Sequence, residues 1–189
     1  MGVLYQKYQC PSCNEAVVFK HVFTNFAVCN NCKSVVQNEP KKAVQLTAYA
    51  SFTNTVSPIN IGMKGNWQNK NFEVIGGSRV WMQETVFHYW TIIFSDNTYG
   101  WLSEGYGLFA ICLETKPNQV INYGSLNSLK TGDKRNLDIK KSASILLKKS
   151  VVTKIEFIGE AWMQNVGSEL EIFEFGATVG NRIEYHQSK

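Results

Sequence analysis

The stretch that decides the first part of the fold is Cys10-Pro-Ser-Cys13 followed by Cys29-Asn-Asn-Cys32. Each pair has two residues between its cysteines, and fifteen residues separate the pairs. Two intervening residues form a tight turn that points both sulfur atoms at one place, so two such turns complete a tetrahedron of thiolates. The spacing therefore predicts a zinc ribbon over residues 1–40 that holds one Zn²⁺ ion.

Four cysteine ligands fill the coordination shell of zinc and leave no position for water or substrate, so this zinc is expected to be structural. The segment 15–28 between the pairs is rich in β-forming residues, and Thr24-Asn25 suggests the turn of a hairpin within it. His21 lies in this segment and is an alternative metal ligand. A redox-active pair is a further interpretation of the cysteines, although paired cysteines in a reducing compartment favour a metal.

Composition excludes several classes of protein. The chain has 189 residues, of which 44% are hydrophobic and 18% are charged, which is typical of a folded domain rather than a disordered chain. The net charge of +4 is milder than that of most dedicated nucleic-acid-binding proteins. A signal peptide and a bilayer-length apolar run are not evident, so a cytoplasmic protein without a transmembrane segment is expected.

The residues after the ribbon favour β-structure. Residues 44–52 alternate between apolar and polar, and residues 61–77 read as a hairpin that turns at 69–71 and ends at Gly76-Gly77. Residues 85–94 are apolar on both faces, as in a central strand covered on both sides. We therefore predict a mainly β protein in which residues 41–115 form a first β unit, an SH3-like or other small barrel or sandwich.

Residues 116–189 are predicted to form a second β unit that begins with a polar connector over 116–141. Residues 139–149 are the one candidate for a helix of normal length, and their serine and β-branched content is unfavourable for it. Residues 72–83 faintly resemble residues 155–164, which raises the possibility of two similar β units. Strands are expected at 144–152, 153–162, 170–175 and 179–185.

Four segments carry a family resemblance: Gly62-Met-Lys-Gly-Asn-Trp67, Phe72-Glu-Val-Ile-Gly76, Trp90-Thr-Ile-Ile-Phe94 with Asp96, and Gly100-Trp-Leu-Ser-Glu104. Together they resemble the bacterial family known as domain of unknown function 4178. The resemblance covers residues 58–185 and is strongest over 61–104; farther on, only Gly159-Glu160 and Gly180-Asn-Arg182 match. It implies a bacterial protein with a cysteine ribbon ahead of the domain, and it implies no activity.

Aromatic residues supply the first set of candidate contact residues. Trp101 and Glu104 lie in the distinctive Gly-Trp-Leu-Ser-Glu motif, where an indole platform and a carboxylate would contact a ligand or partner. Trp67 and Trp90 would extend an exposed aromatic surface. The alternative is that tryptophans on strands pack in the core, which is the more frequent arrangement.

A basic segment, residues 130–154, supplies the second set of candidate contact residues. A nucleic-acid-binding face would use phosphate contacts, whereas the alternative is a solvated loop that Asp133 and Asp138 dilute. The basic residues that would make these contacts are Lys130, Lys134, Arg135, Lys140 and Lys141.

Catalysis has the least support. His88 has Glu84 and Asp96 near it in sequence, but a lone histidine on a buried strand is more often a hydrogen-bonded core residue. Cys112 reads as a small buried hydrophobic residue. The leading hypothesis is a non-enzymatic zinc-ribbon adaptor that binds a protein partner. The second is a nucleic-acid-binding protein, and the third is an enzyme of unknown type.

Overall fold

The computed structural model describes most of the chain and divides it into two compact units. The first unit comprises Met1–Leu113 and Lys154–Met163, and the second comprises Glu114–Thr153 and Gln164–Lys189. The ribbon and the strands up to residue 113 therefore belong to one unit, while the three-part division suggested by the sequence stays a prediction. The described residues are 6–39, 42–47, 49–52, 57–83, 85–115, 123–137, 143–163, 170–177 and 182–188.

The ribbon is built from two antiparallel hairpins, in which β1 pairs with β2 and β3 pairs with β4. The predicted hairpin within residues 15–28 is wrong, because β2 and β3 belong to different hairpins. The reason is that each cysteine pair occupies a turn, so the strands on either side of that turn pair with one another. The strands of the ribbon are β1 (Gln6–Gln9), β2 (Ala16–Phe19), β3 (Phe26–Val28), β4 (Val35–Glu39) and β5 (Lys42–Gln45).

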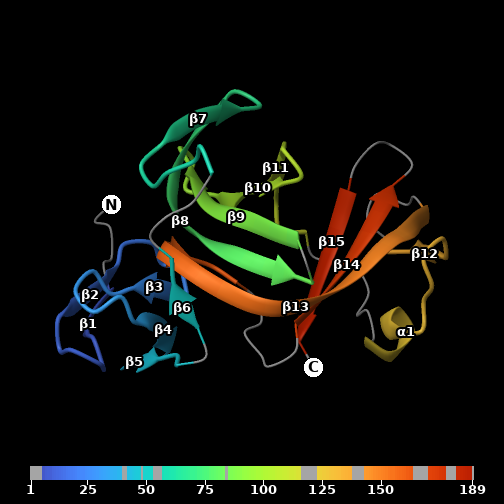
Figure 1. Cartoon of the computed structure of the whole chain (residues 1–189). Coiled ribbons are helices and arrows are strands. Elements are labelled where there is room, and N and C mark those ends of the chain that lie inside the picture. The colour runs from blue at the N-terminus through green and yellow to red at the C-terminus, as the bar shows by residue number, and fades with distance from the viewer. Residues whose placement is uncertain are drawn as a thin grey trace. The chain divides into compact units, whose positions relative to one another are not determined.

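The larger part of the first unit is an open sheet with the strand order β11-β10-β9-β8-β13-β3-β4-β5, so the ribbon strands β3 to β5 extend this sheet (Figure 1). The prediction of a mainly β protein is confirmed. The predicted strand over 44–52 is instead two strands, β5 and β6. Beyond the ribbon the unit contains β6 (Ala50–Ser51), β7 (Lys64–Trp67), β8 (Lys70–Met82), β9 (Thr85–Phe94), β10 (Tyr99–Gly105), β11 (Leu108–Cys112) and the C-terminal part of β13 (Ala143–Ala161).

The predicted hairpin over 61–77 forms between β7 and β8, but β8 does not end at Gly76-Gly77 and continues to Met82. A Cβ atom at Gly76 would lie 2.2 Å from the backbone oxygen of Glu160 on β13. Glycine at this position therefore permits the close approach of two backbones and does not end the strand. The two similar segments, 72–83 and 155–164, contribute to these neighbouring strands.

The core of the sheet lies on one face of β9. Trp90, Ile92 and Phe94 pack there with Phe52 and Val74, and all five side chains are buried. On the opposite face of β9, Phe87 and Tyr89 are also buried. β9 lies between β8 and β10, so the prediction of a central strand covered on both sides is confirmed.

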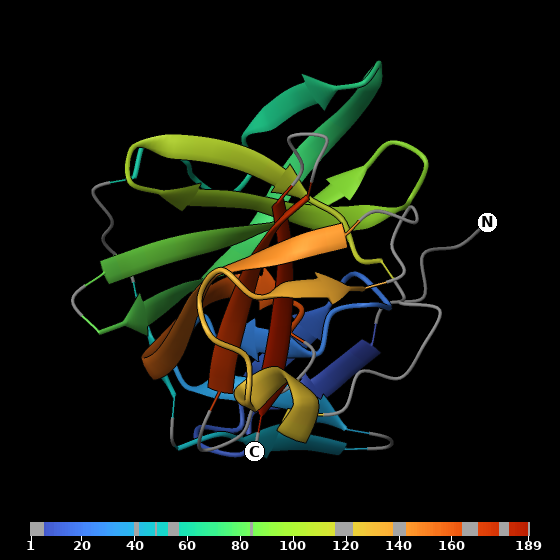
Figure 2. The same ribbon diagram turned by 90° about the vertical axis from the view of Figure 1, so that its right-hand side faces the viewer.

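The second unit combines the N-terminal part of β13 with one short helix and three further strands (Figure 2). The candidate helix at 139–149 is wrong in its described part, because residues 143–149 belong to β13, which pairs there with β12 and β14. The buried core consists of Leu126, Leu137, Leu146, Phe173 and Phe175. The other elements are α1 (Tyr123–Asn127), β12 (Lys134–Asn136), β14 (Leu170–Ala177) and β15 (Arg182–Ser188).

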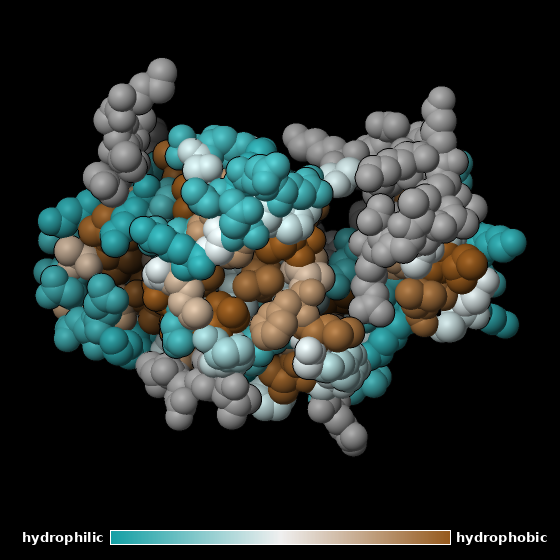
Figure 3. All heavy atoms as spheres, turned by 90° about the horizontal axis from the view of Figure 1, so that it is seen from above, coloured by the Kyte–Doolittle hydropathy of each residue, from teal (hydrophilic) through white to brown (hydrophobic). Residues whose placement is uncertain are grey.

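Hydrophobic side chains also reach the surface, and Figure 3 shows brown groups between teal ones on one face. Within the part of the chain that the structure describes, no helix is both long enough and apolar enough to cross a bilayer. Among the large hydrophobic residues that the structure describes, Val22, Leu108 and Tyr106 have the largest exposed fractions, at 73%, 71% and 68%.

Candidate functional site

The four cysteines of the ribbon sit in two turns with the same backbone geometry. Cys10 and Cys13 lie between β1 and β2, while Cys29 and Cys32 lie between β3 and β4. In each turn the fifth residue has φ of 62° and donates its N–H to the carbonyl of the first cysteine. These donors are Asn14, at 2.8 Å from the Cys10 oxygen, and Lys33, at 3.0 Å from the Cys29 oxygen.

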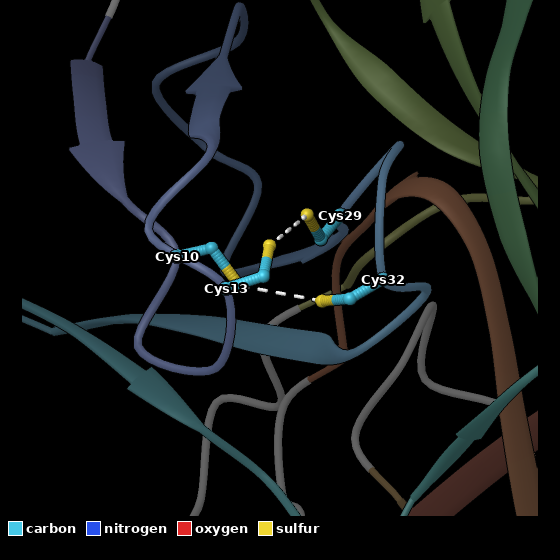
Figure 4. A group of neighbouring side chains, drawn as sticks. All are labelled: Cys10, Cys13, Cys29 and Cys32. Carbon is cyan, nitrogen blue, oxygen red and sulfur yellow. Dashed lines mark hydrogen bonds between the residues drawn. The ribbon is translucent and has the colours of Figure 1, made fainter.

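The two turns bring the four sulfur atoms together (Figure 4). All four Sγ atoms lie within 4.8 Å of one another. The Cys10–Cys32 and Cys13–Cys29 sulfur distances are 3.6 Å and 3.7 Å. A tetrahedral ion with metal–sulfur bonds of about 2.3 Å requires sulfur atoms about 3.8 Å apart. The four cysteines are thus positioned to hold a metal ion.

The cluster is asymmetric in exposure and acidity. Cys10 and Cys29 are buried, with exposed fractions of 2% and 1%, whereas Cys32 is exposed. Burial raises the pKa of the Cys10 thiol to about 11. The hydrogen bond between Cys32 and the Ser34 side chain lowers the pKa of Cys32 to about 6. Burial therefore disfavours the thiolate form of Cys10, while hydrogen bonding favours the thiolate form of the exposed Cys32.

His21 is engaged elsewhere and is not part of the sulfur cluster. Its Nδ1 atom lies 3.2 Å from Oε2 of Glu160, a buried carboxylate on β13. The same oxygen accepts hydrogen bonds from the backbone N–H groups of Lys20 and His21, at 2.9 Å and 3.2 Å, and from the Thr24 hydroxyl at 3.0 Å. One carboxylate of the sheet therefore holds the loop that joins the two ribbon hairpins.

Further contacts fix the ribbon on the sheet. The Asn25 side chain donates to the Met163 carbonyl at 2.8 Å and accepts from the Met163 N–H at 3.1 Å. The rings of Phe26 and Phe157 stack with centroids 4.9 Å apart. The ribbon is thus packed against β13 and is not a loosely tethered appendage.

The tryptophans singled out from the sequence have different surroundings. Trp90 is 1% exposed and belongs to the core. Trp67 is half-buried against Phe94, with ring centroids 6.1 Å apart. Trp101 is half-buried, lies 4.9 Å from Trp162 between ring centroids and donates its indole N–H to the Trp162 carbonyl at 3.2 Å.

Glu104 forms a buried polar cluster with Trp90 rather than with Trp101. Its Oε2 atom accepts the Trp90 indole N–H at 3.2 Å and the Ser57 hydroxyl. The Glu104 side chain is only 15% exposed, and His88 Nδ1 lies 3.6 Å from the same oxygen. The Gly-Trp-Leu-Ser-Glu motif therefore contributes a mostly buried carboxylate, that of Glu104.

Sequence reasoning missed the residues that surround His88. On the neighbouring strands, Arg79 and Glu104 lie directly opposite His88, so the three form one row across β8, β9 and β10. Burial lowers the pKa of His88; the negative charge of Glu104 opposes this shift and the positive charge of Arg79 adds to it. Of the two acidic residues expected near His88, Asp96 instead pairs with Lys70 at 2.6 Å, and Glu84 lies outside the described residues.

The Nε2 atom of His88 is buried and has no hydrogen-bond partner among the described residues. A neutral imidazole beside a carboxylate can accept a proton. The cavity lined by Lys64, Glu73 and Asn97 contains neither His88 nor Glu104. The row could not be recognised in the sequence, because eight residues lie between Arg79 and His88 and fifteen lie between His88 and Glu104. Cross-strand register alone brings the three residues together.

The basic candidates lie in the second unit. Lys130 and Lys134 are exposed, and Arg135 is half-buried. Lys140 and Lys141 lie outside the described residues. Lys149, in the same basic segment, donates to the backbone and side-chain oxygens of Asn127 at 2.8 Å and 3.0 Å. Part of the segment's positive charge thus has a structural role.

No protein-family model, curated protein or solved structure matches this chain. We therefore infer its function from the chemistry of the residues described above.

Proposed function

We propose that the four-cysteine centre binds one structural Zn²⁺ ion. Cysteine thiolates are soft ligands that favour zinc or iron in a tetrahedral S₄ arrangement, and zinc is the usual occupant of paired Cys-x-x-Cys turns. The sulfur spacing of 3.6–3.7 Å across the cluster supports such a tetrahedron. This convergence of four sulfur atoms is the observation that carries the proposal.

The function that we propose is a non-enzymatic zinc-ribbon adaptor that binds a protein partner in the bacterial cytoplasm. A metal held by four thiolates has no open position for substrate, so its contribution is to cross-link the two hairpins. The hydrogen bonds from the ribbon loop to Glu160 support a rigid placement of this module on the sheet.

The metal proposal is tested by elemental analysis of the purified full chain. We expect one zinc per chain in the natural protein and none in the Cys13→Ser, Cys32→Ser double variant. The Cys112→Ser variant is a matched control, because Cys112 is not part of the sulfur cluster. Preparations without stoichiometric metal, or with iron in place of zinc, would contradict the proposal.

The adaptor role is tested separately by capture of partners from a native bacterial lysate. We expect the zinc-loaded chain to retain a defined protein that the Cys13→Ser, Cys32→Ser variant releases. Recovery of no protein above the background of an unrelated zinc protein would count against an adaptor, whatever the metal content.

Nucleic-acid binding is the second candidate, and the exposure of Lys130 and Lys134 favours it. Contacts to phosphate release counterions, so affinity for DNA or RNA should fall steeply with salt. We expect the Lys130→Ala, Lys134→Ala variant to bind more weakly and with a smaller salt slope. Binding that is absent or insensitive to salt would remove this candidate.

A further inference from the structure

The hairpin formed by β10 and β11 ends in a tight turn that sets the direction of its backbone groups. Tyr106 and Gly107 have φ of 54° and 75°, as a two-residue type I′ turn requires, and Gly105 pairs with Leu108 on either side of it. In such a turn the flanking pair is hydrogen-bonded, and hydrogen-bonded pairs then alternate along the ladder. The N–H and C=O groups of Phe109 and Ile111 therefore point away from β10.

β11 is the last strand in the order of the sheet, and among the described residues it pairs with β10 alone. The outward groups of Phe109 and Ile111 therefore form a row of donors and acceptors suited to another strand. The side chains at the start of β11, next to the turn, are apolar and exposed, with exposed fractions of 71% for Leu108 and 50% for Phe109. Such an edge favours strand pairing both in its backbone and in its side chains.

Most of the other strands that have a single described neighbour carry charged residues; the exceptions are β2, which pairs with β1, and the two-residue β6, which pairs with β13. Charged residues, lysine above all, discourage pairing at sheet edges, and β11 has none among its five residues, Leu-Phe-Ala-Ile-Cys. The charged residues of the other edge strands are Lys7 in β1, Lys42 in β5, Lys64 in β7, Lys134 and Arg135 in β12, and Arg182 and Glu184 in β15.

We propose that β11 pairs antiparallel with β11 of a second copy of this chain, about a two-fold axis at Ala110. This register places Phe109 opposite Ile111, and these are the two residues whose backbone groups point outward. It also places two small Ala110 side chains at the close, non-hydrogen-bonded pair on the axis. A two-fold axis would set like charges against each other on a charged strand, whereas β11 carries no charge.

The first test measures the mass of the full chain by sedimentation equilibrium over a wide concentration range. A contact of one short strand is small, so we expect a dimer that dissociates on dilution. Phe109→Pro removes an outward N–H without removing a hydrogen bond to β10 and should give a monomer with an unchanged circular dichroism spectrum. Phe109→Lys should also give a monomer, by adding charge to the edge.

Val22→Lys is the control, because Val22 is a hydrophobic residue even more exposed than Phe109, at 73% against 50%, but lies in the ribbon loop. We expect this variant to dimerise as the natural chain does. A natural chain that is monomeric at every concentration would overturn the proposal, even if β11 binds a strand of another protein. A dimer that survives both Phe109 substitutions would also overturn it.

The second test examines the register. In a Cys112→Ala background, mild oxidation of Ala110→Cys should give a disulfide-linked dimer, because residues of a non-hydrogen-bonded pair have Cβ atoms about 4.5–5.5 Å apart. Leu108→Cys should cross-link more slowly, since it faces position 112 of the second copy. Equal rates for the two variants would exclude the proposed axis. The sedimentation test does not depend on the metal content of the ribbon.

Discussion

The ribbon and the sheet around Trp90 belong to one compact unit but are held together by different means. The ribbon core contains few large apolar side chains, chiefly Val17, Phe19 and Val36, and two of its buried residues are Cys10 and Cys29 of the sulfur cluster. The sheet core instead buries large side chains, including Trp90 and two phenylalanines. A small module with so little apolar area depends on a cross-link, whereas the sheet depends on burial.

The largest effect is expected from Cys29→Ser. A structural zinc site contributes about 10–16 kcal/mol of apparent binding free energy, and a small ribbon cannot replace it. We expect loss of metal and rapid hydrogen exchange of the amides in β1 to β4, while amides in β9 and β10 keep their protection. Cys112→Ser should change neither.

Simultaneous loss of protection in β9 would contradict this difference between the two regions, because the sheet would then depend on the metal as much as the ribbon does.

The second effect is on the sheet. Truncation of a large buried aromatic side chain destabilises a protein by about 3–5 kcal/mol. We expect Trp90→Ala to lower the free energy of unfolding by this amount in a denaturant titration and also to remove the hydrogen bond to Glu104. The half-buried Trp67 is the control, and Trp67→Ala should be clearly milder. Equal losses for the two variants would argue against a core centred on Trp90.

The third effect concerns the junction between the two regions, where Glu160 accepts bonds from the ribbon loop. Hydrogen bonds to a charged group contribute about 1.5–3 kcal/mol each, so Glu160→Gln should lower the free energy of unfolding by roughly that amount. We expect faster zinc loss to a chelator as well. Glu15→Gln, at an exposed position in the ribbon, should leave both measurements unchanged.

If Glu160→Gln were as stable as the natural chain and kept its zinc equally well, the ribbon would be an independent module.

The smallest effect is the pH dependence due to His88, whose pKa is lowered from 6.5 by burial. The unfolded chain then binds the proton first as the pH falls below about 6.5, so the stability that neutral His88 provides is full above this pH and decreases below it. The slope is at most about 1.4 kcal/mol per pH unit. Denaturant titrations across this range should show a shallower slope for His88→Gln than for the natural chain.

An identical slope in the two proteins would mean that other groups, such as the metal-site thiols, account for all of the acid sensitivity.

The cysteine cluster was predictable from the sequence because its geometry is local. Two residues between cysteines fix each turn, and the turn requires only that the following residue adopt positive φ, as Asn14 and Lys33 do. The apolar pattern of residues 85–94 likewise predicted a covered central strand, because side chains alternate along any strand. The predicted strand end at Gly76-Gly77 was wrong, because a glycine required by backbone packing looks the same in sequence as a glycine that ends a strand.

The sequence by itself determined the two cysteine turns and the β character of the chain, since both depend on residues that are close together along the backbone. The tertiary structure alone decided which strands are neighbours. It thereby placed Arg79, His88 and Glu104 in one row and brought Glu160 within hydrogen-bond distance of the ribbon loop. The physical reason is that strand pairing joins backbone groups of any sequence, so the register depends on the packing of the whole sheet.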